Sequence, residues 1–127
     1  MATIDEKLNI SINRGDMLPL TIKLKNKDGS DYFFQKGDVI RFKVFKKKDC
    51  NCVEVQKDIT VEETSETVDL IITSQEMKIG DIIEKPVEYW YEVELNPDTD
   101  FTQTIIGYTL EDGAKILWLL PEGANKQ

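Results

Sequence analysis

The 127-residue chain contains no histidine and only two cysteines, Cys50 and Cys52. Histidine is the most frequent general base of enzymes and the most frequent metal ligand, so its absence removes the commonest route to both functions. Two cysteines separated by one residue cannot complete the tetrahedral ligand set of a zinc site by themselves. We therefore expect reduced, unliganded thiols in a charged loop over residues 46–52, and no cofactor or metal.

Long apolar segments and an excess of positive charge are also missing. No apolar run approaches the roughly 20 residues of a membrane-spanning helix, and Met1–Lys7 lacks the apolar core of a signal peptide. Lysine and arginine number 16 against 24 aspartates and glutamates, a net charge of −8. Because nucleic-acid affinity comes largely from lysine and arginine contacts to phosphate, we expect no nucleic-acid partner. From the missing apolar segments we expect no membrane contact and initial folding in the cytoplasm. We interpret Lys46-Lys47-Lys48 as a solvated loop.

A nucleophile with a base beside it, which covalent catalysis needs, is not recognisable in the sequence. The best remaining candidate for catalysis is a pair of carboxylates, because Glu92 and Glu94 lie two residues apart. On a strand their Cβ atoms would be roughly 6.5–7 Å apart, a spacing that a glycosidase pair could have. Alternating glutamates are also typical of a solvated strand face. This simpler interpretation predicts a protein without catalytic residues that is not an enzyme.

Apolar and polar residues alternate along most of the chain, which is the period of a β-strand. The length and the 40% hydrophobic, 31% charged composition suit one globular domain. We therefore predict an all-β fold, an Ig-like antiparallel β-sandwich of about eight strands that spans residues 1–127 as a single domain. The capping-box sequence Thr73-Ser74-Gln75-Glu76 predicts one short helical turn. The expected strands lie near residues 8–12, 18–24, 40–44, 53–62, 68–72, 87–95, 102–110 and 114–120.

Several details of these strands can be predicted. Pro19 lies inside an alternating run, so its strand should be at a sheet edge or bulged. Arg14-Gly15-Asp16 has the sequence of the integrin-binding tripeptide, but we interpret it as a turn that connects two strands. Residues 102–110 and 114–120 are expected to form a hairpin closed by Glu111-Asp112-Gly113. The expected core includes four residues with charged neighbours on the opposite face, Phe42, Tyr89, Tyr91 and Val93.

Two features point to contact with a partner. Trp90 falls on the charged face of strand 87–95. The segment Lys115–Leu120 is apolar on both faces, with Leu117 and Leu119 on one and Trp118 on the other. A sandwich strand needs only one apolar face, so the second must be covered by an N- or C-terminal segment of this chain or by another chain. Trp90, Leu117, Trp118 and Leu119 are therefore the candidate partner interface.

The order and spacing of several short motifs resemble the N-terminal domain of phage baseplate upper proteins, a family of the tail apparatus of phages of Gram-positive bacteria. The motifs are Arg14-Gly15-Asp16, Lys27-Asp28-Gly29, Gly37-Asp38-x-Ile40-Arg41-Phe42-x-Val44, Tyr89-x-Tyr91-Glu92-x-Glu94-Leu95 and Gly107. Together they span nearly the whole chain. The resemblance implies an Ig-like sandwich that packs into a virion or phage-tail-like particle after folding in the host cytoplasm, and it brings no catalytic residues.

The implied partners are other virion or tail-particle proteins and multiple copies of the chain itself. Members of that family usually continue into a C-terminal receptor-binding region, whereas this sequence stops at Gln127, so we expect a stand-alone baseplate or tail adaptor or a decoration subunit. The alternative is a non-catalytic carbohydrate- or surface-binding module of Ig-like fold. A sugar binder would gather exposed aromatic residues in one groove, whereas a structural subunit would spread its contacts along edges and termini.

Overall fold

The computed structural model describes residues 2–46 and 49–121, and the backbone alone for residues 49–51. Within these residues the chain is all-β and contains no helix, as the period-two pattern predicts. No described segment is therefore a helix with the length and apolar character needed to cross a membrane. The strands are β1 (Thr3–Ile4), β2 (Ile10–Asn13), β3 (Leu18–Lys23), β4 (Val39–Lys46), β5 (Asp49–Thr60), β6 (Thr67–Ile72), β7 (Val87–Leu95), β8 (Gln103–Ile106) and β9 (Lys115–Leu120).

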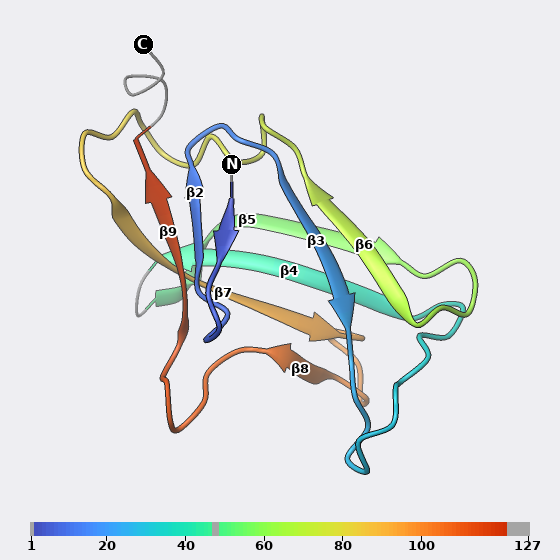
Figure 1. The fold of residues 1–127 in the computed structure, drawn as a ribbon. Helices are drawn as coiled ribbons and strands as arrows, with labels where there is room; N and C mark the ends of the chain where they lie inside the picture. The colour runs from blue at the N-terminus through green and yellow to red at the C-terminus, as the bar shows by residue number, and fades with distance from the viewer. Residues whose placement is uncertain (1, 47–48, 122–127) are drawn as a thin grey trace.

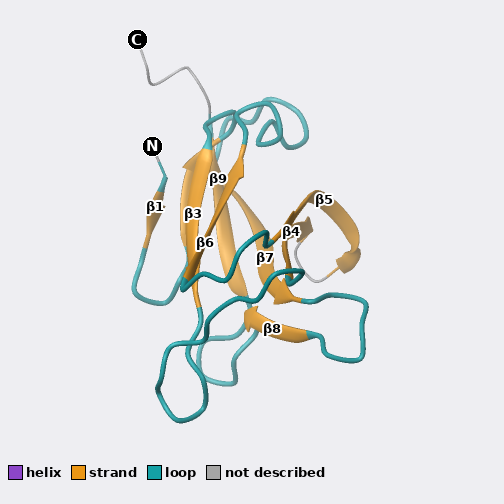
Figure 2. Ribbon diagram, turned by 90° about the vertical axis from the view of Figure 1, so that its right-hand side faces the viewer, coloured by secondary structure: helices purple, strands orange, loops and turns teal. Residues whose placement is uncertain are grey.

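The strands form a large sheet and a small one. The large sheet has seven strands in the order β1-β2-β9-β7-β4-β5, with β8 also paired to β7, and the small sheet is the pair β3-β6 (Figure 1). The β3-β6 pair lies over one face of the large sheet (Figure 2). All strand pairs are antiparallel except β2 and β9, which run parallel with Ile10 opposite Leu117 and Asn13 opposite Leu120.

β7 is central to the large sheet because it pairs along both edges. On one edge β4 accompanies it from Tyr89 to Leu95. The other edge is shared end to end, with β9 beside residues 87–91 and β8 beside residues 93–95. The expected hairpin between residues 102–110 and 114–120 is therefore wrong, because both strands pair with β7 and only Thr109 bridges Gly113. A nine-residue strand offers enough edge for two short partners.

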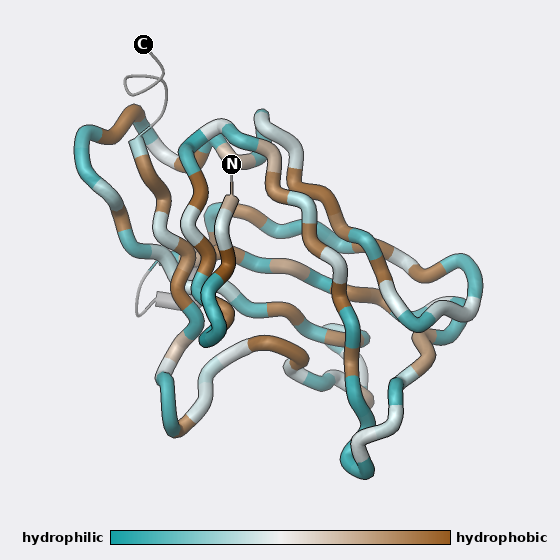
Figure 3. The backbone as a smooth tube through the Cα atoms, viewed as in Figure 1, coloured by the Kyte–Doolittle hydropathy of each residue, from teal (hydrophilic) through white to brown (hydrophobic). Residues whose placement is uncertain are grey.

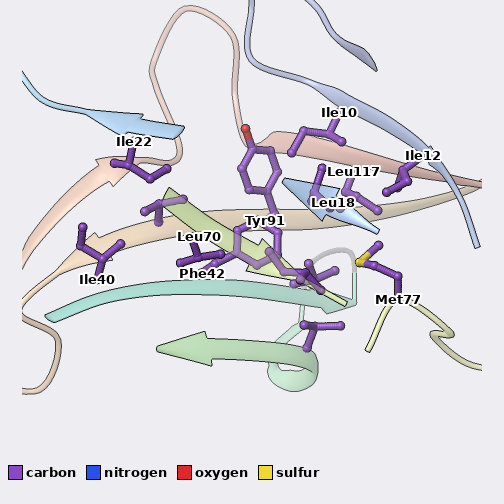
Figure 4. Packing of buried hydrophobic residues seen from close by; sticks show 14 of the residues in the cluster. Ile10, Ile12, Leu18, Ile22, Ile40, Phe42, Leu70, Met77, Tyr91 and Leu117 are labelled. Carbon is purple, nitrogen blue, oxygen red and sulfur yellow. The ribbon is translucent and has the colours of Figure 1, made fainter. Parts of the chain in front are cut away.

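The core lies between the two sheets. Along the strands apolar and polar residues alternate (Figure 3), and on β6 buried and exposed positions alternate without exception. Phe42, Tyr91 and Val93 are buried as predicted, whereas Tyr89 is half-buried and packs against the core from its margin. The ring of Tyr91 stands next to Phe42, with ring centroids 5.7 Å apart (Figure 4). Fully buried side chains come from both sheets and from the segments between strands, among them Ile10, Ile12, Leu18, Phe34, Ile40, Phe42, Val44, Ile72, Met77, Leu117 and Leu119.

The expected loop over residues 46–52 is largely strand. β5 begins at Asp49, which already pairs with Lys46 of β4. The β4–β5 register shifts on both sides of Phe45, so the pairing is irregular here and the sequence does not alternate as it does in a regular strand. Cys52 lies half-buried on β5, while the Cys50 side chain is outside the described residues. Two of the three residues of the lysine run, positions 47 and 48, are outside them as well.

The capping-box sequence makes its hydrogen bonds without starting a helix. The Thr73 backbone N–H donates to Glu76 Oε1 at 2.9 Å, and the Glu76 N–H donates to Thr73 Oγ1 at 3.2 Å. Only hydrogen-bonded turns follow, so the expected helical turn is not seen. Starting a helix is unfavourable, because the first turn fixes several dihedral angles and gains one hydrogen bond. Gly80, at φ 62°, ends the segment before enough further hydrogen bonds can form to offset this entropy cost.

Arg14 fixes this turn segment to the connection between β2 and β3. Its Nε donates to the Ile79 carbonyl at 2.9 Å, and one terminal nitrogen donates to the Gly80 carbonyl at 2.6 Å. The neighbouring Gly15, at φ 87°, provides the left-handed conformation that the turn between β2 and β3 needs. β3 then carries Pro19 and pairs only with β6 among the described residues, so the strand is an edge, as proline requires.

Candidate interaction surface

The large sheet has a second face that points away from the small sheet, here called the outer face. β7 places the even-numbered residues from Glu88 to Glu94 on it, because side chains alternate along a strand. Trp90 is therefore on the outer face, as the sequence predicts, and it is half-buried there. β4 contributes Arg41, Lys43 and Phe45 to the same face.

A row of apolar residues crosses the outer face in register. Phe45 of β4 lies opposite Val53 of β5 on one side and Trp90 of β7 on the other, and Trp90 in turn lies opposite Ile116 of β9. The rings of Phe45 and Trp90 meet edge to face, with centroids 6.4 Å apart and an interplanar angle of 79°. The ammonium group of Lys43 lies 5.7 Å from the Phe45 centroid. Cross-strand aromatic pairs of this kind each stabilise a sheet by about 0.5–1.5 kcal/mol.

Trp118 extends this row along β9. It is two residues beyond Ile116 and so on the same face, where Glu88 of β7 and Ser11 of β2 flank it. Its side chain is 38% exposed, a large fraction for a tryptophan on a strand. We call Phe45, Val53, Trp90, Ile116 and Trp118 the outer apolar row.

The remainder of the outer face is charged. Arg41 binds Asp58 through two hydrogen bonds of 2.9 and 3.0 Å and reaches Asp98 at 2.9 Å. Hydrogen bonds to Asp58 and Asp98 raise the pKa of Arg41 above its usual value. Next along the face, Lys43 pairs with Glu92 at 3.3 Å. One part of the face therefore carries paired charges, and another part exposes apolar atoms of Val53 and Trp118 to solvent.

Leu117 and Leu119 do not belong to this surface. Both are fully buried and point into the core from β9, on the face opposite Trp118. Each is already covered by this chain's own side chains, so the outer apolar row does not include them. The C-terminal segment 122–127, which could cover the other face, is outside the described residues.

Three members of the outer apolar row, Phe45, Val53 and Ile116, were not among the predicted interface residues. Phe45 could have been found, because alternation along residues 40–44 puts position 45 on the same face as Arg41 and Lys43. Val53 could not, because the bulge between Val44 and Phe45 decides which residue of β5 stands opposite Phe45.

The surface carries no recognisable reactive group. Among the described residues, no cluster of three or more cysteine, aspartate or glutamate side chains is arranged to hold a metal ion. Comparison of the chain with models of protein families found no match. Comparisons with curated proteins and with solved structures also found none.

Proposed function

We propose that the chain is a structural subunit of a phage tail or of a prophage-encoded tail-like particle, a baseplate or tail adaptor or a decoration subunit that acts by packing in multiple copies. The observation that carries the proposal is the outer apolar row, an apolar strip on the exposed face of a sheet. Its partly exposed members, Val53 and Trp118, gain free energy when a neighbouring subunit covers them. Buried apolar surface contributes about 25 cal/mol per Å².

Repetition makes such a contact effective. A strip that includes one partly exposed tryptophan gives a weak interface by itself, smaller than that of a stable dimer. In a particle, each subunit meets several neighbours at once, and linked weak contacts reach a far higher combined affinity than any one of them. A subunit of this design remains unassembled in dilute solution and joins only where neighbours are already aligned.

The strand order supports the Ig-like sandwich that the sequence resemblance implies. In Ig-like domains, strands C, F and G are neighbours in one sheet and strands B and E are neighbours in the other. Here β4, β7 and β9 are neighbours in the large sheet, and β3 and β6 form the small one, in the same chain order. Sandwiches of this kind expose two outer faces and several edges to neighbours, which suits a packing role.

The distribution of exposed aromatic residues favours the structural subunit over the carbohydrate-binding module. A sugar-binding groove needs aromatic rings on one surface. The exposed aromatic side chains instead lie on separate segments: Phe33 before β4, Phe101 before β8, Tyr108 after β8 and Trp118 on β9.

Particle purification tests the proposal. Tail-like particles induced from the producing strain should contain the chain in a fixed ratio to the tail proteins, measured by mass spectrometry of gradient fractions. The Trp118→Ser variant, supplied to a strain that lacks the gene, should fold but be depleted from particles. Ile71→Ser is the matched control, because Ile71 is 49% exposed on a strand of the small sheet. Recovery of the unaltered chain only among unassembled proteins would overturn the proposal.

A further inference from the structure

β8 (Gln103–Ile106) is the outermost strand of its half of the large sheet. It pairs with β7 on one edge, and among the described residues no strand pairs with its other edge. Figure 1 shows it at the margin of the sheet, below β7, with a loop leaving from each end. The unpaired edge of a strand presents backbone N–H and carbonyl groups to which another extended chain can bind.

Features that discourage such pairing are found on two other edge strands, β3 and β5. β3 carries Pro19, which cannot donate a backbone hydrogen bond. β5 carries Lys57 on the core side of the sheet, opposite Phe42, where it pairs with Glu76 at 3.2 Å. Inward-pointing charges and proline are the usual means by which edges avoid pairing with other chains. β8, with the sequence Gln-Thr-Ile-Ile, contains neither a charge nor a proline.

Large apolar side chains are exposed in the segments immediately before and after β8. Phe101 precedes the strand and is 78% exposed, while Tyr108 and Leu110 follow it at 69% and 98%. Single exposed apolar residues are ordinary on protein surfaces. Here three of them lie within ten residues, on the segments that enter and leave β8, and their exposed side chains are available to a strand that pairs with it.

The charge around β8 specifies the partner further. From Pro86 to Ala114 the sequence contains no lysine or arginine. Asp100 is next to Phe101, Glu111 is next to Leu110, and Glu94 stands opposite Thr104 of β8. No basic side chain of the described residues forms an ion pair with these three carboxylates. Positive charge on a partner would therefore find carboxylates that are not already neutralised.

We infer that β8 accepts an extended segment of another protein, which adds to the sheet as a strand and carries lysine or arginine on both sides of apolar residues. The main-chain bonds would hold the segment, and Phe101, Tyr108 and Leu110 would cover its apolar side chains. A second copy of this chain does not fit the description, because its net charge of −8 would bring carboxylates against carboxylates. The inference does not depend on membership of a particle, since it rests on a surface other than the outer apolar row.

A short synthetic peptide tests the inference. The probe has alternating valine and threonine with a pair of lysines at each end, and its control has glutamates in place of the lysines. Fluorescence anisotropy measures binding to the full chain, and amide NMR shifts locate it. We expect the lysine peptide alone to bind, with the largest shifts at Gln103–Ile106, and its affinity to fall as salt is raised.

Two altered chains and a control locate the contact. The double change Phe101→Ser with Leu110→Ser removes exposed apolar contacts, and Asp100→Lys with Glu111→Lys reverses the flanking charge; each should weaken binding at least about tenfold. Ile82→Ser should have no effect, because Ile82 is as exposed as Phe101, at 77%, but lies in the segment between β6 and β7. Equal binding of both peptides, no binding at millimolar concentration, or a salt-resistant dimer of the chain through β8 would each overturn the inference. None of these results bears on particle membership.

Discussion

The Tyr91 hydroxyl donates a hydrogen bond to the carbonyl of Leu8, a residue 83 positions earlier in the chain. Leu8 has a φ of 67°, which a leucine rarely adopts, and Asp5 holds the turn around it by accepting bonds of 2.9 Å from the N–H groups of Lys7 and Asn9. The ring of Tyr91 itself lies among the buried side chains of the core, near Phe42 (Figure 4). One buried phenol therefore joins the N-terminal turn to the central strand.

The first prediction separates the hydroxyl of Tyr91 from its ring. Tyr91→Phe should lower the free energy of unfolding by about 1 kcal/mol, because it removes one buried hydrogen bond. Tyr91→Ala should lower it by about 3 kcal/mol or more, because it also leaves a cavity. Urea unfolding measures both values. Equal losses for the two variants would show that the ring packing contributes nothing.

We predict that glycine is required at position 107, because the neighbouring side chains leave no room for a Cβ atom. A Cβ at this position would lie 2.6 Å from Thr104 Cγ2 and 3.9 Å from Glu92 Cβ. Gly107→Ala should therefore cost about 1–3 kcal/mol of stability, as overpacking does. Thr104→Ser lacks the obstructing methyl group, so the double variant should recover most of the loss in thermal unfolding. A double variant as unstable as Gly107→Ala would place the cause in the backbone.

Asp38 should make stability depend on acidic pH. Burial raises its pKa, but hydrogen bonds from the Gln35 N–H, the Tyr32 hydroxyl and the Asn96 amide outweigh burial, so the pKa is lowered overall. A carboxylate with a lowered folded-state pKa stabilises the fold above its unfolded value of about 4, and that contribution is lost as pH falls through the folded value.

Asp38→Asn tests this dependence. The variant should be less stable than the unaltered chain at pH 7, and the difference should shrink toward pH 3, as followed by urea unfolding across the range. The same difference at every pH would assign the effect of the substitution to packing.

Arg14 is predicted to hold the segment 78–80 in place and not to serve as a ligand for a receptor. Arg14→Lys keeps the charge but cannot reproduce the guanidinium bonds to the carbonyls of Ile79 and Gly80. It should cost about 1–3 kcal/mol and increase cleavage near the exposed Ile82 in limited proteolysis. Unchanged proteolysis would show that other contacts hold the segment.

Leu117 and Trp118 should respond in opposite ways to the same substitution. Leu117→Ser places a hydroxyl in the core and should cost more than about 3 kcal/mol. Trp118→Ser alters a partly exposed side chain and should cost about 1 kcal/mol or less. Thermal unfolding of the two purified variants measures the contrast, and similar losses would mean that Trp118 supports the fold and is not an available contact.

The faces of the strands could be predicted from the sequence because alternation is a local property. Phe42 and Val93 are buried, and Trp90 is on the outer face, as their neighbours indicate. Pro19 likewise marks an edge, since no strand other than β6 accompanies β3 in the described residues.

Which strands pair could not be predicted, because pairing is decided by distant residues. Gly113 sits in a sequence typical of a hairpin turn, yet the strands on either side of it each prefer β7. Alternation within Lys115–Leu120 shows two apolar faces but not which face the core occupies. That choice was settled by the register between β2 and β9, which brings Leu117 opposite Ile10.

The place of β9 between β2 and β7 has a consequence for synthesis. Residues 10–13 leave the ribosome early, but their partner strand ends at Leu120. Until then the β1-β2 pair has no strand that links it to the rest of the large sheet, and the edge of β7 at residues 87–91 stays open. Contacts between such distant residues form slowly, and unpaired edges invite aggregation. A stalled or truncated translation product that lacks β9 should therefore be a substrate for chaperones and proteases, however complete the rest of its sequence.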